Sequence, residues 1–195
     1  DDVWTAEFYR SFLQVLMRAD VVSTCSQPQR AALIGQLSMI GRLTGANAGH
    51  EIVHAVPNSI DAEELRSLGR IERRPRAAGE PFVVLWSGGY NTWCDPDLLF
   101  AVLERAMSEE PRLTFVSTGG GIEGHHTEAY DRICALARGS RHAERYRFAG
   151  WVQTSELPSY YADAHVAILT DRFGYEGVLG ARTRMLDWLA AGLPI

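Results

Sequence analysis

The segment 171–184, DRFGYEGVLGARTR, gathers residue types that bind a charged ligand. Arg182 and Arg184 stand at the start of a predicted amphipathic helix, where guanidinium groups and free backbone amides together favour a diphosphate. Asp187, about one turn further along, could accept hydrogen bonds from ribose hydroxyls, and Glu176 could accept them from a sugar. The alternative for the same residues is a salt-bridged helix start with Arg184 paired to Asp187.

A glycine pair, Gly88 and Gly89, follows the apolar run 81–87. Glycine lets the backbone approach a ligand closely, and an unblocked amide can donate a hydrogen bond to a phosphate oxygen. This loop is therefore a candidate for the other half of a phosphate site, with a simple tight turn as the alternative.

Three further glycines, Gly119, Gly121 and Gly124, satisfy the GxGxxG pattern of dinucleotide-binding proteins. A nicotinamide site also needs an acidic residue at the end of the next strand to hold the ribose, and that strand ends in Gly150 and Trp151. We therefore expect this loop to form the wall of some other crevice. Trp151 could stack on a base or a sugar, or fill space in the loop.

A parallel sheet is expected to position these loops. Four apolar, strand-like runs are separated by segments long enough for helices, which is typical of an α/β domain with crossover helices. Ligands of such doubly wound sheets bind at the carboxyl ends of the strands, where the loops above would lie. The runs cover residues 81–87, 112–118, 145–150 and 164–170.

A linker is predicted at 69–80, GRIERRPRAAGE, because charges and glycines surround a proline there without apolar periodicity. Residues 1–68 are then the end of a preceding domain, and 81–195 are the ligand-binding domain. Since the chain has no initiator methionine and opens within a helical pattern, we expect it to be a fragment whose second domain is cut before its next strand.

Composition excludes several classes. The net charge of −5 and the scattered arginines provide no basic stripe for nucleic acid. The three cysteines have no CxxC spacing, which favours a reducing compartment, and the neighbouring His125 and His126 would point in different directions rather than ligate one metal ion. No apolar run approaches the roughly 20 residues of a membrane-spanning helix. We expect a cytoplasmic protein.

Three stretches taken together resemble the donor-binding half of the GT-B glycosyltransferases, and more narrowly their retaining family four. They are VVLWSGGYNTWCDPDLL, FAGWVQTSELPSYYADAHVAI and EGVLGARTRMLDWLAAGLPI. The resemblance implies two Rossmann-like domains that close on a nucleotide sugar without a required metal. It also implies a role for each matching residue. Arg182, which neutralises the diphosphate, and Glu176, which contacts the sugar, would be the catalytic residues. The binding residues would be Gly88, Gly89 and Arg184 at the diphosphate, Asp187 at the ribose, and Trp151 and Val152 beside the base.

The sequence departs from that family in two respects. Glu176 and Asp187 are spaced more widely than the family's pair of glutamates, and the second is an aspartate. The Arg and Lys that many relatives place after the first strand are missing from SGGYNTW, which leaves the phosphate charge to Arg182 and Arg184. The acceptor-side residues of the family would lie upstream of Asp1, so we expect the chain to lack a complete active site.

The function implied by this resemblance is transfer of a sugar, with retention, from a nucleoside-diphosphate sugar to a glycan, a lipid-linked glycan or a small molecule. No resident cofactor, metal or nucleic-acid partner is expected, and peripheral association with the inner face of the membrane is compatible with such acceptors. One alternative is a nucleotide-sugar epimerase of the same fold. Another is a catalytically degenerate glycosyltransferase that serves as a binding subunit.

Overall fold

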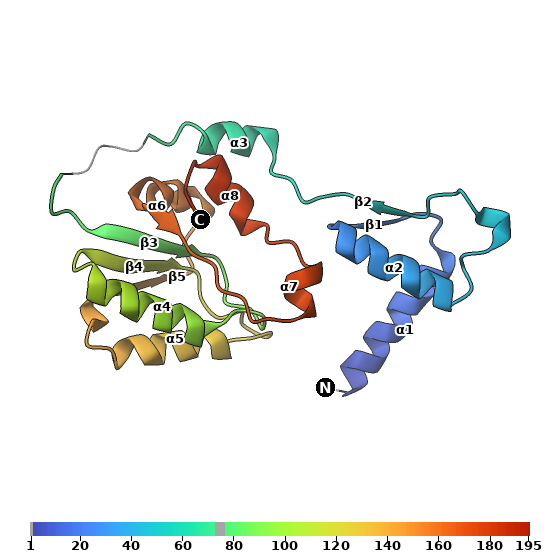
Figure 1. Ribbon diagram of the computed structural model, residues 1–195, viewed down its shortest axis with the longest axis horizontal. Coiled ribbons are helices and arrows are strands. Elements are labelled where there is room, and N and C mark those ends of the chain that lie inside the picture. Colours follow the sequence, from blue (N-terminus) through green and yellow to red (C-terminus); the bar gives the residue numbers. More distant parts are fainter. Residues whose placement is uncertain (1, 73–76) are drawn as a thin grey trace. The chain divides into compact units, whose positions relative to one another are not determined.

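The computed structural model describes residues 2–72 and 77–195 (Figure 1). The chain forms two compact units. Unit 1 comprises Asp1–Asn58 together with Gly174–Ala181, and unit 2 comprises Ser59–Phe173 together with Arg182–Ile195.

Unit 1 is a small α/β unit around a parallel strand pair, in which Val22 lies opposite Val53. The helix Gln27–Met39 is capped at its start, because Ser26 Oγ accepts a hydrogen bond from the backbone amide of Gln29 at 3.2 Å. The same hydroxyl donates to the Leu179 carbonyl at 2.7 Å and so ties the segment 174–181 to this unit. Its elements are α1 (Asp2–Arg18), β1 (Val22–Thr24), α2 (Gln27–Met39), the 3-10 turn η1 (Gly45–Asn47), β2 (Val53–Ala55) and α7 (Tyr175–Leu179).

Unit 2 contains the predicted parallel sheet, whose described strands have the order β5-β4-β3-β6. After Gly192 the chain runs beside β6, because the Ala167 amide donates to the Pro194 carbonyl at 2.7 Å. The strands are β3 (Phe82–Ser87), β4 (Leu113–Thr118), β5 (Tyr146–Gly150) and β6 (Val166–Ala167). The helices and 3-10 turns are α3 (Ala62–Leu68), α4 (Pro96–Glu109), α5 (Glu128–Arg138), η2 (Ala143–Arg145), η3 (Thr154–Glu156), α6 (Leu157–Asp163) and α8 (Arg184–Ala190).

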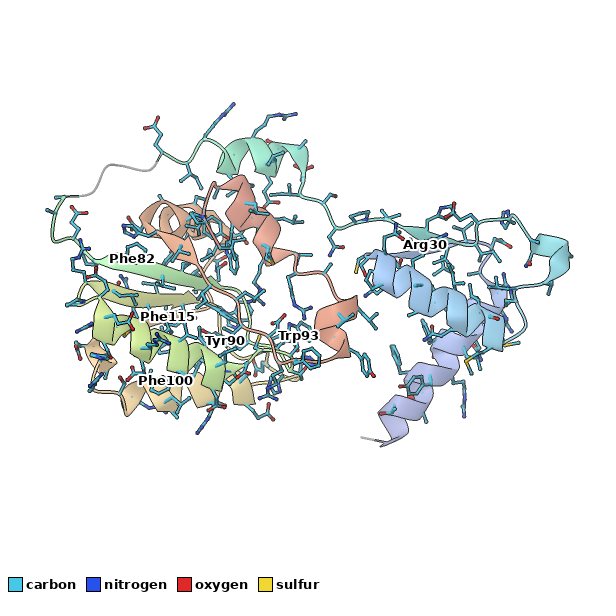
Figure 2. All side chains as sticks on the ribbon, in the orientation of Figure 1. Arg30, Phe82, Tyr90, Trp93, Phe100 and Phe115 are labelled. Atoms are coloured by element: carbon cyan, nitrogen blue, oxygen red, sulfur yellow. The ribbon has the colours of Figure 1, made fainter. Side chains whose placement is uncertain are left out.

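Helices cover both faces of this sheet, with α4 and α5 on one face and α6 and α8 on the other (Figure 1). Alternation along β3 explains the two cores, because Trp86 packs in the cluster that includes Phe115 on the α4 side, whereas Leu85 packs in the cluster that includes Trp188. Figure 2 labels Phe115 at the sheet and Phe100 on α4 beneath it. This is the doubly wound Rossmann-like architecture that the sequence predicts.

The compact units differ from the predicted domain boundaries at two places. Helix α3 was expected in the first domain, yet Leu68 is buried in the unit 2 core against Trp188 and Tyr161. The segment 174–181 was expected in the second domain but clusters with unit 1. Both segments are short helices, and their sequences alone do not indicate which unit they pack with. Residues 73–76 of the predicted linker lie outside the described residues.

Candidate functional site

The loop after β3 is fixed at the carboxyl end of the sheet. The Gly88 amide donates to the Thr118 carbonyl at 2.6 Å, and the fully buried Tyr90 shares a hydrogen bond of 2.9 Å with Ser117 Oγ. The Tyr90 ring stacks on Trp86 with centroids 4.6 Å apart. Burial strongly raises the pKa of Tyr90. Tyr90, labelled in Figure 2, therefore anchors the loop as a neutral phenol.

Arg184 lies against this loop with an incompletely satisfied guanidinium. Its Cζ is 5.2 Å from the centroid of the Trp86 ring, and its NH2 donates to the Gly89 carbonyl at 2.7 Å. Its NH1 is buried and has no hydrogen-bond partner among residues 2–72 and 77–195. Burial lowers the pKa of Arg184, which reflects the cost of holding this charge away from water. An anion at NH1 would offset that cost.

Gly88 meets the guanidinium directly. Its φ is +93°, and a Cβ at this position would lie 3.3 Å from Arg184 Cζ. The predicted alternative of an Arg184–Asp187 ion pair is not formed within the described chain, because Arg184 turns toward Gly88 and Gly89 instead.

Arg182 has a different environment. Its Nε lies 2.6 Å from Asp171 Oδ2, and the two side chains are only 12% and 20% exposed. Its Cζ is 5.0 Å from the ring centroid of Trp93, which Figure 2 labels near Tyr90. The Arg172 amide also donates to the Trp93 carbonyl at 2.7 Å. The positive charge of Arg182 is thus already balanced by Asp171, whereas that of Arg184 is not balanced by a contacting carboxylate in the described chain.

Arg184 opens onto a cavity of about 310 Å³. A second cavity, of about 430 Å³, adjoins it through two residues that line both, Glu64 and Asp187. The first is lined by Ser59, Ile60, Asp61, Glu64, Gly88, Thr183, Arg184, Leu186 and Asp187, and the second by Glu64, Ser67, Leu68, Thr154, Ser155, Leu157, Pro158, Tyr161 and Asp187. After the role that the sequence analysis expects for these loops, we call the two together the donor crevice.

Asp187 carries the central carboxylate of the donor crevice. Partial burial raises its pKa, and the nearby carboxylate of Glu64 adds to the effect. No side-chain hydrogen bond reaches the Asp187 carboxylate from the described residues, so its oxygens can accept hydrogen bonds from a ligand. Glu64 was not identified from the sequence, because an acidic residue in the first turn of a helix is ordinarily explained by the helix dipole.

Gly89 is required by packing. A Cβ on Gly89 would lie 3.0 Å from both Ile122 Cγ1 and Trp151 Cη2. The space beside this glycine is therefore filled by those two side chains rather than left for a ligand. In the GxGxxG loop, a Cβ on Gly119 would overlap the Gly88 carbonyl oxygen. The two glycine-rich loops are therefore packed against each other, which accounts for that motif without a dinucleotide.

Trp151 and Val152, which were expected to flank the base, do not line the donor crevice in the described chain. Trp151 is 62% exposed, and its Nε1 donates to the Gly121 carbonyl at 3.0 Å. Of the chain after β5, the donor crevice is lined by Thr154 and Leu157 rather than by Trp151 and Val152, as far as the described residues show.

Glu176 is placed with the other unit. It lies on α7, which packs beside α2 in unit 1, while the donor crevice belongs to unit 2. The structure therefore gathers Gly88, Arg184 and Asp187 in one crevice of unit 2, and the expected sugar contact of Glu176 stays a prediction.

The described residues contain no candidate metal centre. Within 2–72 and 77–195 no three His, Cys, Asp or Glu side chains are grouped as a metal ion would need. His125 Nε2 lies 3.0 Å from Asn91 Oδ1, and His126 Nδ1 lies 2.6 Å from Glu128 Oε2. No helix in these ranges has both the length and the apolar character to cross a membrane.

Several solved structures share this fold. TarM matches with a TM-score of 0.62 over 95% of this chain and 31% of its own length, at 14% identity. An alpha,alpha-trehalose-phosphate synthase (UDP-forming) from Burkholderia vietnamiensis has a TM-score of 0.61 at 15% identity, over 88% of this chain and 42% of its own. The pneumococcal O-GlcNAc transferase GtfA, in complex with UDP and GlcNAc, has a TM-score of 0.56 at 18% identity, over 90% and 29%.

These likenesses confirm the predicted GT-B, Rossmann-like fold. At such identities they establish the fold alone, and the chain spans only 29% to 42% of the length of these three proteins. No protein-family model matches the chain, and no curated protein matches its sequence.

Proposed function

We propose that this chain is the donor-binding part of a glycosyltransferase that uses a nucleoside-diphosphate sugar. The observation that carries the proposal is Arg184, a partly buried cation whose NH1 has no partner in the described chain, beside Gly88 at the wall of a cavity. Burying an uncompensated charge is costly, so a side chain held in this way is a good receptor for an anion. A diphosphate supplies that anion, and Asp187 supplies acceptors for a ribose in the same crevice.

The proposed donor follows the shape of the crevice. Its diphosphate lies along Gly88 and Arg184, its ribose passes Asp187, and its base extends toward Thr154, Leu157 and Tyr161. Neighbouring structures support uridine as the first base to test, because GtfA was solved with UDP and an Escherichia coli neighbour is described as bound to UDP-2-fluoro glucose. No resident cofactor or metal is needed for this arrangement.

The proposed chemistry is electrostatic. As the bond from the sugar to the diphosphate breaks, the leaving diphosphate gains negative charge, and a fixed guanidinium binds that charge more strongly in the transition state than in the ground state. Arg184 is prepositioned for this by Trp86 and by its bond to the Gly89 carbonyl. The principal cation of the proposal is thus Arg184, while Arg182 holds the loop through Asp171. Retention and a sugar contact by Glu176 remain proposals that rest on the family resemblance.

Calorimetric titration tests this proposal. UDP, GDP, ADP and dTDP are titrated into the chain with a chelator present, and inorganic phosphate is the control ligand. We expect one diphosphate to bind without metal, and its uncharged nucleoside to bind far more weakly because it lacks the group that Arg184 holds. If the folded chain binds none of the four, or binds the nucleoside equally well, the diphosphate role of the crevice is wrong.

A further inference from the structure

We infer that Glu64 is a further donor-binding residue, which together with Asp187 accepts the hydrogen bonds of the ribose hydroxyls and so selects ribonucleotides over deoxyribonucleotides. This inference rests on the proposed function. It assigns a role to α3, which the sequence placed in the other domain and which the structure packs into unit 2 through Leu68.

A nucleotide bound in the donor crevice must pass from one cavity to the other. Arg184 and Gly88 line only the smaller cavity, whereas Thr154 and Tyr161 line only the larger one. Glu64 and Asp187 line both cavities and therefore stand where they join. In a nucleoside diphosphate the ribose is the covalent connection between phosphates and base. If the phosphates lie at Arg184 and the base at Tyr161, the ribose passes between these two carboxylates.

Glu64 and Asp187 form a pair of hydrogen-bond acceptors. Ionised carboxylates only accept hydrogen bonds, and a ribose presents two neighbouring hydroxyl donors. The free protein holds Glu64 close enough to Asp187 to disfavour ionisation of the latter. The other groups near Asp187 do not relieve this, because Tyr161 is hydrogen-bonded to Ser87 and Arg184 is turned to the Gly89 carbonyl. Two ribose hydroxyls would satisfy both carboxylates together.

Glu64 differs from an ordinary acidic residue in the first turn of a helix. The cap of α3 is already provided by Asp61, whose Oδ1 accepts from the amides of Glu63 and Glu64 at 2.8 and 3.2 Å. Glu63 lies in the same turn and is equally exposed, yet it lines neither cavity among the described residues. Glu63 is therefore a matched control, with the same charge and the same helix dipole but no place in the crevice.

The test compares nucleotides that differ only at the ribose. UDP, GDP and ADP, each with its 2′-deoxy and 3′-deoxy form, are titrated into the wild-type chain and into E64A, E63A and R184A. We expect the wild type and E63A to prefer the ribonucleotide by about tenfold over at least one deoxy form, as for a hydrogen bond to a charged group. E64A should lose most of that preference and leave the affinity for the deoxy form nearly unchanged.

The outcomes separate the two claims. If E64A discriminates between ribose and deoxyribose as the wild type does, while R184A still weakens binding, the role of Glu64 is wrong and the diphosphate site stands. If E63A loses the preference for the ribonucleotide as fully as E64A, that preference depends on the negative charge at the start of α3 rather than on a contact with Glu64, and the inference is likewise wrong. If the wild type binds no nucleoside diphosphate, both the proposed function and this inference are wrong.

Discussion

Gly88 lies against Arg184 at the mouth of the donor crevice, so that a side chain at position 88 would displace the guanidinium of Arg184. The backbone of Gly88 has φ +93°. A Cβ at this position would lie only 3.3 Å from Arg184 Cζ, so the glycine leaves the space that the guanidinium needs. The two residues are far apart in the sequence and are brought together because α8 follows β6 back onto β3.

Substitution of Gly88 by Ala is expected to weaken diphosphate binding. The left-handed backbone alone should reduce the free energy of unfolding by about 1 kcal/mol, and displacement of Arg184 should add a loss of affinity. Gly124 is the matched control, since its φ is +73° and nothing lies within 4 Å of its Cβ position. G124A should lose stability but keep its UDP affinity, which urea unfolding and calorimetry would measure. Equal affinity losses in both variants would contradict the contact with Arg184.

Removal of Arg182 is expected to affect stability more than binding. Its pair with Asp171 is largely shielded from water, so R182A leaves Asp171 without its partner and should reduce the free energy of unfolding by about 2 kcal/mol. D171A should cost a similar amount, and the double variant should cost clearly less than the sum, which a double-mutant cycle in urea would measure. Purely additive costs would show that the pair contributes nothing to stability.

Asp187→Asn is expected to stabilise the free protein while it weakens nucleotide binding. Burial and Glu64 raise the pKa of Asp187 above its ordinary 3.8, so the folded state binds a proton more readily than the unfolded state. Wild-type stability from this group is therefore greatest at low pH and is lost as the pH rises through the folded-state pKa.

Thermal unfolding of D187N and the wild type across pH 4 to 8 tests this sign. The variant should gain on the wild type as the pH rises from about 4, and the difference should be small at the acidic end, where both side chains are neutral. A D187N variant that is less stable than the wild type at neutral pH would contradict the claim that the ionised Asp187 carboxylate destabilises the free protein.

Truncation of Leu68 tests whether α3 belongs to unit 2. This side chain is 6% exposed and packs with Trp188, so L68A should reduce stability by about 2 to 4 kcal/mol. Leu65 of the same helix is 47% exposed, and L65A should cost far less. Hydrogen exchange should show the loss of protection in α8. Loss confined to β1 and β2 would instead place α3 with unit 1.

The elements of unit 2 could be predicted because their signals are local. The apolar, strand-like runs at 82–87 and 113–118 indicate strands before any tertiary contact is known. Asp95 followed by Pro96 is likewise typical of a helix start. The GT-B resemblance was likewise carried by local motifs whose order along the chain is visible in the sequence.

The division of labour between Arg182 and Arg184 could not be predicted in this way. The two residues have the same type and are separated by one position, and only the fold decides that Asp171 reaches the first and Gly88 the second. Glu64 was missed for the same reason, since its crevice exists only once α3 packs beside α8. The sequence predicted a ligand contact for Gly89, and it could not reveal that the side chains of Ile122 and Trp151 leave no room for a Cβ there.

The most direct test of the central claim compares two arginines in one titration. UDP, or whichever diphosphate the panel identifies, is titrated with a chelator into the wild type, R184A and R182A. Loss of a hydrogen-bonded charge should weaken binding to R184A by about tenfold to a hundredfold, while R182A, measured at a temperature where it remains folded, should stay within a few-fold of the wild type. Full affinity in R184A with binding lost in R182A would contradict the account and return the diphosphate to Arg182.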